Sequence, residues 1–314
     1  MANTTTRRPF RFGVQISEVR NGAAWKEQAR KAEALGYDIL VMPDHLGGRF
    51  AIGPALAVAA EATRTLRIGT LVLQNDLRHP ALVAMEAATL DVLSDGRFEL
   101  GLGAGGSFLP DYEWTGITLD PPGARVGRLE ESVPIIKGLF APDPLTFAGR
   151  HYRIANFDGL PKPVQRPHPP LLIGGGGPRM LALAAREADI VSIFSRMLPS
   201  GGRFRDDELK ASAVADKVAF LRHAAGDRFP HLELNILVQV VAITEDRQAE
   251  LERLSAKWGI PVDWLDSPHI LVGTTRQIAD ELHAYREQLG LSYFVVFERH
   301  MDAFAPVLAE LAGG

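Results

Sequence analysis

The feature that most constrains this fold is a regular alternation of short apolar segments with helix-like segments along nearly the whole sequence. Strands of a parallel sheet that is covered on both faces read as almost continuous apolar runs. The apolar segments lie at 10–16, 38–42, 66–73, 97–102, 170–174, 189–194, 232–243 and 293–298. The helix-like segments that follow them lie at 23–35, 54–63, 80–94, 125–140, 178–187, 206–224, 246–256 with 275–289, and 303–311. The alternation predicts the α/β class.

Eight strand–helix units are the number that closes a (β/α)₈ TIM barrel, with an open doubly wound sheet as the alternative. In a barrel, the active site lies at the C-terminal ends of the strands. Two connections, Gly105–Ala124 and Ala141–Pro169, exceed ordinary loop lengths and are expected as inserted loops at that face. The second contains LTFAGRHYRI, which predicts a hairpin, followed by an extended proline-rich stretch. Pro134 is expected to kink or shorten the helix at 125–140.

A single barrel accounts for 314 residues, so we expect residues 1–8 as a flexible N-terminus and 9–314 as one domain. The net charge of -4 gives no basic footprint for a nucleic-acid partner. No apolar run approaches the roughly 20 residues that span a bilayer, and the N-terminus lacks a secretory apolar region. The sequence has no cysteine, which excludes disulfides and thiolate nucleophiles. These features fit a cytoplasmic enzyme without a membrane partner.

The segment RFELGLGAGG, residues 97–106, matches G-x-G-x-x-G. In dinucleotide-binding proteins such glycines let backbone N–H groups approach a pyrophosphate, and the motif opens a helix of the first βαβ unit. Here three strand-like segments come first, and Pro110 is poorly placed within a first helix. We interpret the segment as the fourth barrel strand, in which Gly103, Gly105 and Gly106 let a ring or substrate approach bare backbone.

Polar residues follow two other predicted strands. Asp44 and His45 come after the second strand, and a carboxylate beside an imidazole suits acid–base chemistry near neutral pH. A capping Asp44 with a structural His45 is the alternative. Gln74 and Asn75 follow the third strand and offer donors and acceptors to a heterocycle, although turn chemistry also selects such residues.

The four glycines Gly174–Gly177 follow the fifth strand and precede Pro178 and Arg179. Strand, glycine loop and helix N-terminus in this order predict an anion site, because consecutive backbone N–H groups are exposed there. An unliganded flexible loop is the alternative. The nine histidines show no spacing that brings two metal ligands together, so no metal is expected.

Several ordered segments together resemble the luciferase-like monooxygenase superfamily, in particular its coenzyme F420-dependent oxidoreductases. They are FGVQI, EALGYDILVMPDHL, RIGTLVLQNDLRHPALVAMEAATLDVLSDGRFELGLGAGG, RLEESVPIIKGLF and PKPVQRPHPPLLIGGGG. The resemblance implies a (β/α)₈ barrel, usually a homodimer, with a flavin or deazaflavin at the C-terminal ends of the strands.

The resemblance also implies roles for individual residues. His45 would stand beside the reactive face of the ring with Asp44 next to it, as the catalytic residues. Leu71 and Val72 fall where members often carry a non-prolyl cis peptide whose bulge supports the ring. The expected cofactor-binding residues are Gln15, Leu71, Val72, Gln74, Asn75, Gly103, Gly105, Gly106, Gly174, Gly175, Gly176, Gly177, Arg179 and Met180.

The sequence departs from the sugar-phosphate dehydrogenases of this branch at two points. Gly106 stands where they have a glutamate, and Gly47-Gly48-Arg49 stands where they have an aromatic residue. Both departures argue against glucose 6-phosphate as the substrate.

We therefore expect hydride transfer between coenzyme F420 and a small organic substrate, with His45 exchanging the accompanying proton. An FMN-dependent monooxygenase is the first alternative, because both ring systems use the same barrel mouth. A non-catalytic flavin-binding relative and an NAD-dependent Rossmann enzyme are the others. The sequence specifies neither the substrate nor the direction of transfer.

Overall fold

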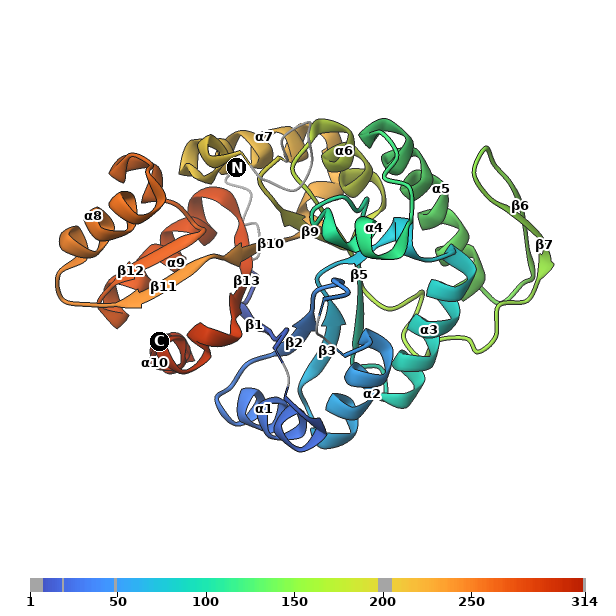
Figure 1. The fold of residues 1–314 in the computed structure, drawn as a ribbon, viewed down its shortest axis with the longest axis horizontal. Helices are drawn as coiled ribbons and strands as arrows, with labels where there is room; N and C mark the ends of the chain where they lie inside the picture. The colour runs from blue at the N-terminus through green and yellow to red at the C-terminus, as the bar shows by residue number, and fades with distance from the viewer. Residues whose placement is uncertain (1–7, 19, 48–49, 197–204, 313–314) are drawn as a thin grey trace.

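The computed structural model describes residues 8–18, 20–47, 50–196 and 205–312. Within these residues, eight parallel strands close into a barrel through a pairing of β3 with β5 (Figure 1). The strands are, in barrel order, β3 (Arg67–Thr70), β2 (Ile39–Met42), β1 (Arg11–Gln15), β13 (Leu291–Phe297), β10 (Glu233–Val238), β9 (Ile190–Ile193), β8 (Leu171–Gly175) and β5 (Phe98–Gly103). The predicted barrel is confirmed, and the open doubly wound sheet was the wrong alternative.

Helices surround the barrel, each close to its predicted position (Figure 1). They are α1 (Gly22–Ala34), α2 (Ile52–Ala62), α3 (Pro80–Leu93), α5 (Pro122–Phe140), α6 (Pro178–Glu187), α7 (Ala211–Ala225), α9 (Thr275–Leu289) and α10 (Met301–Ala312). Local signals set several ends: prolines occupy the first turn of α3 and α6, and a Thr274–Gln277 capping box begins α9. Pro134 was expected to kink or shorten its helix. The shortening was wrong, since α5 continues through Pro134, and the kink stays a prediction.

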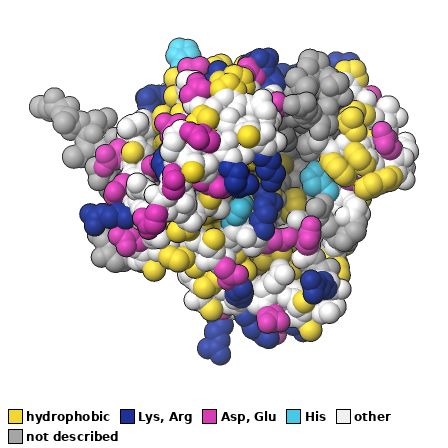
Figure 2. Space-filling view, turned by 60° about the vertical axis from the view of Figure 1, so that its left-hand side comes forward, with side chains coloured by type: hydrophobic (Ala, Val, Ile, Leu, Met, Phe, Trp, Pro, Cys, Tyr) yellow, Lys and Arg dark blue, Asp and Glu magenta, His cyan; other side chains and the backbone are white. Residues whose placement is uncertain are grey.

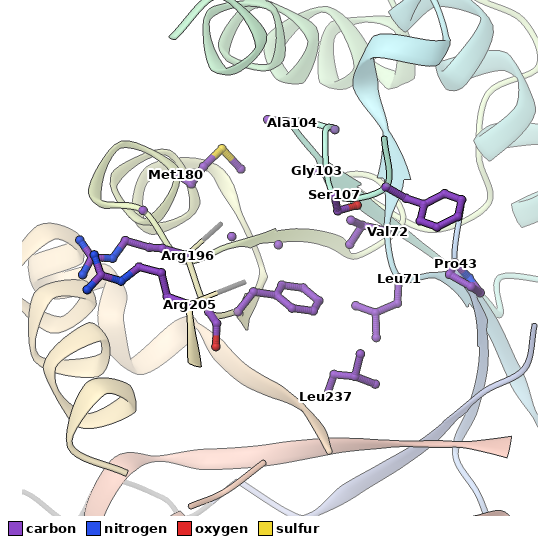
Figure 3. Close-up of a pocket in the computed structure, with 18 of the residues that line it drawn as sticks. Pro43, Leu71, Val72, Gly103, Ala104, Ser107, Met180, Arg196, Arg205 and Leu237 are labelled. Atoms are coloured by element: carbon purple, nitrogen blue, oxygen red, sulfur yellow. The ribbon is translucent and has the colours of Figure 1, made fainter. Parts of the chain in front are cut away.

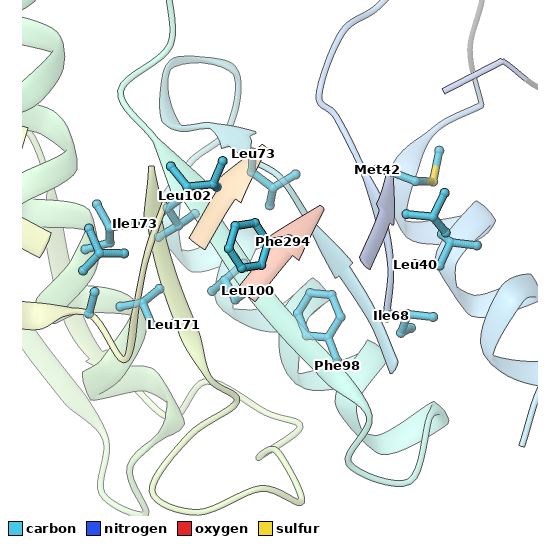
Figure 4. Packing of buried hydrophobic residues seen from close by; sticks show 14 of the residues in the cluster. Leu40, Met42, Ile68, Leu73, Phe98, Leu100, Leu102, Leu171, Ile173 and Phe294 are labelled. Atoms are coloured by element: carbon cyan, nitrogen blue, oxygen red, sulfur yellow. The ribbon is translucent and has the colours of Figure 1, made fainter. Parts of the chain in front are cut away.

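Side chains alternate between two cores along each strand. On β5, Phe98, Leu100 and Leu102 face the helices and pack in the outer core (Figure 4). A second, smaller core fills the barrel interior, with Ile39, Leu172 and Tyr293 among its members. The period of two in a strand explains this division.

An ion-pair cluster lies among the N-terminal ends of the strands. The Arg67 Nε lies 2.5 Å from the Glu99 carboxylate, which also pairs with Arg11, and the Arg11 Nη1 lies 2.5 Å from Glu233. Glu99 and Glu233 are buried, so their charges are balanced by the two arginines inside the barrel end. The cluster places charge at the end of the barrel opposite the predicted site.

The strand predicted at 66–73 is interrupted. It forms β3 and β4 (Leu73–Gln74), with a non-prolyl cis peptide between Leu71 and Val72, as the family resemblance implied.

The strand predicted at 232–243 also divides. After β10, β11 (Val240–Ile243) leaves the barrel and pairs in parallel with β12 (Ile270–Gly273), a strand that the sequence analysis missed. With α8 (Arg247–Trp258) and η4 (Val262–Leu265), these strands form a small lobe beside the barrel (Figure 1).

The long loops contain structure of their own. The predicted hairpin is confirmed as β6 (Leu145–Ala148) and β7 (Arg153–Phe157), an antiparallel pair that projects from the barrel (Figure 1). In the other loop, Pro110 begins the short helix α4 (Pro110–Thr115), a helix that the sequence analysis did not predict. Proline fits the first helical turn because no intrahelical partner is needed there. Four 3₁₀ turns complete the path: η1 (Asn75–Leu77), η2 (Asp206–Leu209), η3 (Gly226–His231) and η5 (Glu298–His300).

Residues 1–7 of the expected flexible N-terminus lie outside the described residues. The guanidinium of Arg8 donates to the backbone oxygens of Pro230 and His231. None of the helices in the described ranges combines the length and apolar character needed to cross a bilayer.

Candidate active site

A cavity of about 990 Å³ opens at the C-terminal ends of the barrel strands (Figure 3). Each barrel strand contributes to its wall at or just after its last residues: Gln15, Pro43, Leu71, Gly103, Gly174, Phe194, Leu237 and Phe297. A cavity of this size can hold a fused ring system together with a small molecule. Among the predicted site residues, those that line it are Gln15, Asp44, His45, Leu71, Val72, Gln74, Gly103, Gly105, Gly174, Gly175, Gly176, Gly177, Arg179 and Met180.

Two predicted residues, Asn75 and Gly106, do not line the cavity. Asn75 is buried, and its Nδ2 lies 3.4 Å from the hydroxyl of Tyr152, next to the hairpin. Asn75 therefore connects the third strand to an inserted loop, which is a structural contact.

Asp44 and His45 do not pair with each other. The buried Asp44 carboxylate binds Arg78 through both oxygens and accepts the backbone N–H of Gln74 at 2.8 Å. These contacts occupy both oxygens of the carboxylate. Asp44 and His45 thus have different partners, and their catalytic roles stay a prediction.

His45 instead pairs with Asp111, which α4 places beside it. The His45 Nδ1 lies 3.0 Å from the Asp111 Oδ2, and Asp111 is fully buried. The Leu46 backbone N–H and the Gln74 Nε2 also donate to this carboxylate, each at 2.8 Å. Burial would raise the pKa of Asp111, but these donors, including His45, hold it below its usual range. An ionised Asp111 fixes His45 with its proton on Nδ1, so the Nε2 is the nitrogen left for other partners.

Phe108 covers the same imidazole. Its ring lies edge-on to His45 at a centroid separation of 5.2 Å and meets Trp114 at 5.8 Å. His45 is thus held between a buried carboxylate and an aromatic ring and keeps about a quarter of its side chain exposed. This arrangement restricts the orientation of the imidazole without burying it.

The Leu71–Val72 peptide explains why glycines surround it. A Cβ on Gly103 would lie 2.7 Å from a Val72 methyl, and one on Gly174 would lie 3.2 Å from the other. The glycines on two neighbouring strands thus give room to the two methyl groups of the Val72 side chain. We predicted that Gly103 lets a ligand approach the backbone. In the structure, the space that a side chain at 103 would need is occupied by Val72.

Gly105 and Gly106 are required by backbone conformation. Their φ angles are +78° and +84°, in the left-handed region that disfavours other residues. A Cβ on Gly106 would also collide with the guanidinium of Arg125, which donates to the Gly105 carbonyl. Arg125 thus occupies the space that a side chain at 106 would need.

The Gly174–Gly177 loop leads into the N-terminus of α6, as predicted. Gly177 is the N-cap residue, no side chain caps this helix, and a Cβ on Gly177 would meet nothing within 4 Å. Gly177 lies at the N-terminus of the helix, where exposed backbone N–H groups and the helix dipole favour an anion. Arg179 was predicted as part of an anion site. In the structure, its Nη2 lies 2.5 Å from the carboxylate of Glu130. Met180 packs beside Gly175, whose Cβ would lie 2.7 Å from that of Met180.

Three of the arginines on the described cavity wall, Arg179, Arg196 and Arg205, pair with acidic residues. Arg196 pairs with the buried Glu208, and Arg205 lies 2.7 Å from Asp207. Figure 3 shows the two arginine side chains. Blue and magenta side chains also intermingle on the face drawn in Figure 2. Arg125, the other arginine on the described wall, donates to backbone oxygens and has no acidic partner among the described residues.

Sequence reasoning missed Asp111, Arg78 and Arg125 because each reaches the site through tertiary contacts. One local signal for Asp111 existed, since Pro110 followed by an acidic residue is typical of the first turn of a helix. The departure noted at Gly47-Gly48-Arg49 lies partly outside the described residues.

The fold and cavity define a (β/α)₈ barrel protein with a glycine-lined ligand site at the ends of its strands. The chain belongs to the luciferase-like monooxygenase family, whose family model matches residues 9–269. An F420-dependent glucose-6-phosphate dehydrogenase of Nakamurella multipartita is 33% identical over 204 residues, or 61% of this chain and 58% of that protein. The chain spans little more than half the length of this relative.

Solved structures share the fold over nearly the whole chain. An F420-dependent secondary alcohol dehydrogenase in complex with an F420–acetone adduct has a TM-score of 0.75 at 20% identity, covering 97% of this chain and 99% of its own. Riboflavin lyase with modified FMN has a TM-score of 0.76 at 14% identity, covering 98% of this chain and 92% of its own. At these identities the similarity establishes the architecture.

Proposed function

We propose that this protein is a coenzyme F420-dependent oxidoreductase that transfers a hydride between the deazaflavin and a small organic substrate. The observation that carries the proposal is His45, fixed by Asp111 at the wall of a cavity that the Leu71–Val72 peptide also lines. The relatives named for coenzyme F420 support the choice of cofactor.

The residues present fit a planar heterocycle. The side chain of Gln74 is buried, its Nε2 donates to the Asp44 carbonyl and to Asp111, and its Oε1 has no partner among the described residues. This acceptor would bind an N–H at the polar edge of the ring, because a buried oxygen without a partner is costly. Gly174–Gly177 with the N-terminus of α6 would hold the phosphate, and Val72 would support the ring. Coenzyme F420, when bound, supplies the hydride chemistry.

His45 exchanges the proton that accompanies the hydride. Because Asp111 holds the Nδ1 proton, the imidazole presents its Nε2 as the site that accepts or donates. Phe108 and the apolar wall limit the access of water to the imidazole. Asp111 acts as a positioning residue and Asp44 as a structural one.

The test is a titration of the full chain with coenzyme F420 and separately with FMN, followed by tryptophan fluorescence and ring absorbance. We expect coenzyme F420 to bind more tightly, and His45→Ala to lose turnover while keeping cofactor affinity. Tight FMN binding with consumption of oxygen would replace the proposal by the flavin monooxygenase alternative. Cofactor binding without turnover for any donor would indicate a non-catalytic relative, and selective NAD binding would revive a dinucleotide enzyme.

The proposed substrate is not glucose 6-phosphate. Gly106 has a left-handed backbone and lies against Arg125, so a catalytic glutamate has no counterpart at that position. Turnover of glucose 6-phosphate at a rate comparable with that of any other substrate would contradict this part of the proposal.

We also propose that residues 9–314 form a single domain and that the protein is a cytoplasmic homodimer. Support for the dimer comes from α3, whose Leu82, Met85 and Leu93 side chains are about half exposed or more. Apolar side chains gathered on one helix are typical of a buried contact. Sedimentation as a monomer at micromolar concentration would contradict the dimer.

A further inference from the structure

We propose that Arg125 binds an oxyanion, either a carboxylate or a phosphate, of a small molecule in the cavity. Arg125 lies in the first turn of α5 and lines the cavity wall. The other three arginines on the described wall pair with acidic residues, whereas Arg125 does not. The proposal deepens the proposed function and rests on it, because the oxyanion would belong to the cofactor or the substrate of the same site.

Backbone oxygens hold the guanidinium of Arg125 in place. Its Nε donates to the Asp120 carbonyl at 3.0 Å, and its Nη1 donates to the Gly105 carbonyl. A Cβ on Gly106 would lie 2.8 Å from the Nη2, so only a bare backbone at this position leaves room for the guanidinium. Arg125 is 6% exposed. Its side chain is therefore packed on most sides and fixed in orientation.

One nitrogen of this guanidinium is left for a ligand. The Nη2 has no acceptor in the part of the chain that the structure describes, and it is not among the polar atoms that the fold covers completely. Because Arg125 is otherwise buried and lines the cavity, the uncovered nitrogen faces the cavity. Its N–H groups carry part of a permanent positive charge, which favours an anionic acceptor over a neutral one.

The carboxylates of Asp76 and Asp120 are bound by a different arginine. The Arg128 Nη2 lies 2.8 Å from the Asp76 Oδ1, and its Nη1 lies 2.5 Å from the Asp120 Oδ2. The Asp76 Oδ2 also accepts the Tyr112 hydroxyl at 3.1 Å. Arg125 is left with carbonyl oxygens as its partners among the described residues. A buried cation without a counter-ion is costly, so an oxyanion from a ligand would stabilise it.

The surroundings of Arg125 connect it to both halves of the site. On one side, the Arg179 Nη1 donates to the Gly123 carbonyl at 2.9 Å, which joins the first turn of α5 to the N-terminus of α6. A phosphate of the cofactor would reach Arg125 from this side. On the other side, Phe108 lines the cavity and contacts His45. A carboxylate of a substrate beside His45 would reach Arg125 from there. The two sources share the chemistry of an oxyanion and are distinguished by separate probes.

The substrate probes are benzoate and benzamide, which have the same size and differ in charge. Their binding to the full chain without cofactor is measured by isothermal titration calorimetry at constant ionic strength. We expect benzoate to bind about tenfold to a hundredfold more tightly, the range that a hydrogen bond to a charged group contributes. In Arg125→Gln, which is neutral but keeps a donor for the Gly105 carbonyl, this ratio should fall to about one.

The cofactor probes are coenzyme F420 and its phosphate-free riboside, titrated into the same proteins and followed by ring absorbance. If the oxyanion is the cofactor phosphate, Arg125→Gln should weaken coenzyme F420 about tenfold or more and leave the riboside unchanged. A change in the benzoate ratio alone would assign Arg125 to the substrate, and a change with both pairs would show a site open to either. No effect of Arg125→Gln on either pair would overturn the proposal.

Arg205→Gln is the matched control. Arg205 lines the same wall, but its charge is paired with Asp207, so both ratios should stay at the wild-type values. An equal loss in Arg205→Gln and Arg125→Gln would show a general effect of charge and would overturn the assignment to Arg125.

If Arg125→Gln fails to fold by circular dichroism, Arg125→Lys decides. Lysine keeps the charge but has a single nitrogen, which cannot serve the Gly105 carbonyl and a ligand with the geometry of the guanidinium fork. At least one of the two ratios should then fall severalfold. Wild-type ratios for both pairs in this variant would overturn the proposal.

The same titrations separate this inference from the proposed function. A wild-type chain that fails to bind coenzyme F420 but prefers benzoate in an Arg125-dependent way would overturn the proposed function and support the inference. Tight binding of coenzyme F420, with neither pair of probes depending on Arg125, would give the reverse.

Discussion

The imidazole Nδ1 of His45 lies 3.0 Å from the carboxylate of Asp111, although 66 positions separate the two residues. The helix α4, which an inserted loop contributes, brings the carboxylate to the end of β2. A buried, ionised partner fixes both the tautomer and the orientation of an imidazole. The pair is therefore the feature from which the proposed proton transfer can be tested.

Replacement of Asp111 by asparagine should lower turnover with coenzyme F420 by about tenfold to a hundredfold, a part of what general acid–base catalysis contributes. Asparagine preserves the size of the side chain but can turn a donor towards His45 and favour the wrong tautomer. The measurement is steady-state kcat as a function of pH, with cofactor affinity determined in parallel. We expect kcat and its pH profile to change while cofactor affinity stays constant.

The control is Glu113→Gln on the same helix, since Glu113 is exposed. It should leave kcat and its pH profile unchanged. An Asp111→Asn enzyme with the wild-type pH profile would show that the carboxylate does not position His45.

Asp44→Asn should act on stability. The buried Asp44 carboxylate pairs with Arg78, and removing one partner of a largely buried pair leaves the other charge uncompensated. We expect a loss of about 2–4 kcal/mol in the free energy of unfolding, measured with urea. Asp302→Asn, in an exposed pair with Lys31, should cost less than about 1 kcal/mol. Unchanged stability with lost turnover in Asp44→Asn would instead assign chemistry to Asp44.

Gly106→Ala tests the conformational argument against a glutamate at this position. The φ of +84° and the adjacent Arg125 both oppose a side chain, so we expect a loss of about 1–3 kcal/mol. The control is Gly177→Ala, since Gly177 has open space and an ordinary φ. Equal stability of the two variants, measured by thermal unfolding, would contradict the argument, and so would glucose 6-phosphate turnover by Gly106→Glu.

The barrel could be predicted because its strands are buried on both faces. Such strands are almost continuously apolar, and this local pattern can be recognised without knowing which strands pair. The sequence analysis missed β12 and the division of 232–243 because a strand that changes sheets keeps the same apolar character. Val240–Ile243 continues the apolar pattern of β10 while pairing elsewhere. The pairing partner of a strand is a tertiary fact that the local pattern does not carry.

The candidate site was predicted by position more successfully than by partner. Residues at the strand ends lie together because the barrel closes, so most of the predicted residues line one cavity. Partners were harder to predict, since consecutive residues in an extended segment point to opposite sides. Asp44 and His45, adjacent in sequence, thus bind Arg78 and Asp111 respectively. The cis Leu71–Val72 peptide followed from the family resemblance and has no signature in the residue types.

The last prediction concerns Glu281, which lies on α9 away from the cavity. Burial raises its pKa to about 7, against the lowering effect of Arg247, whose Nη2 lies 2.8 Å away. The folded state therefore holds this proton up to about pH 7, whereas the unfolded chain releases it near the ordinary glutamate pKa of 4.5. The folded state binds more protons between these values, so Glu281 makes stability fall as pH rises through this window.

Glu281→Gln removes the titration and keeps an acceptor for Arg247. Relative to the wild type, the variant should gain about 3 kcal/mol in the free energy of unfolding between pH 4.5 and pH 8, measured with urea at each pH. Glu310→Gln on α10 is the control, because Glu310 is exposed. Its stability should follow the wild-type curve at every pH. Parallel curves for Glu281→Gln and the wild type would show that Glu281 titrates alike in the folded and unfolded states.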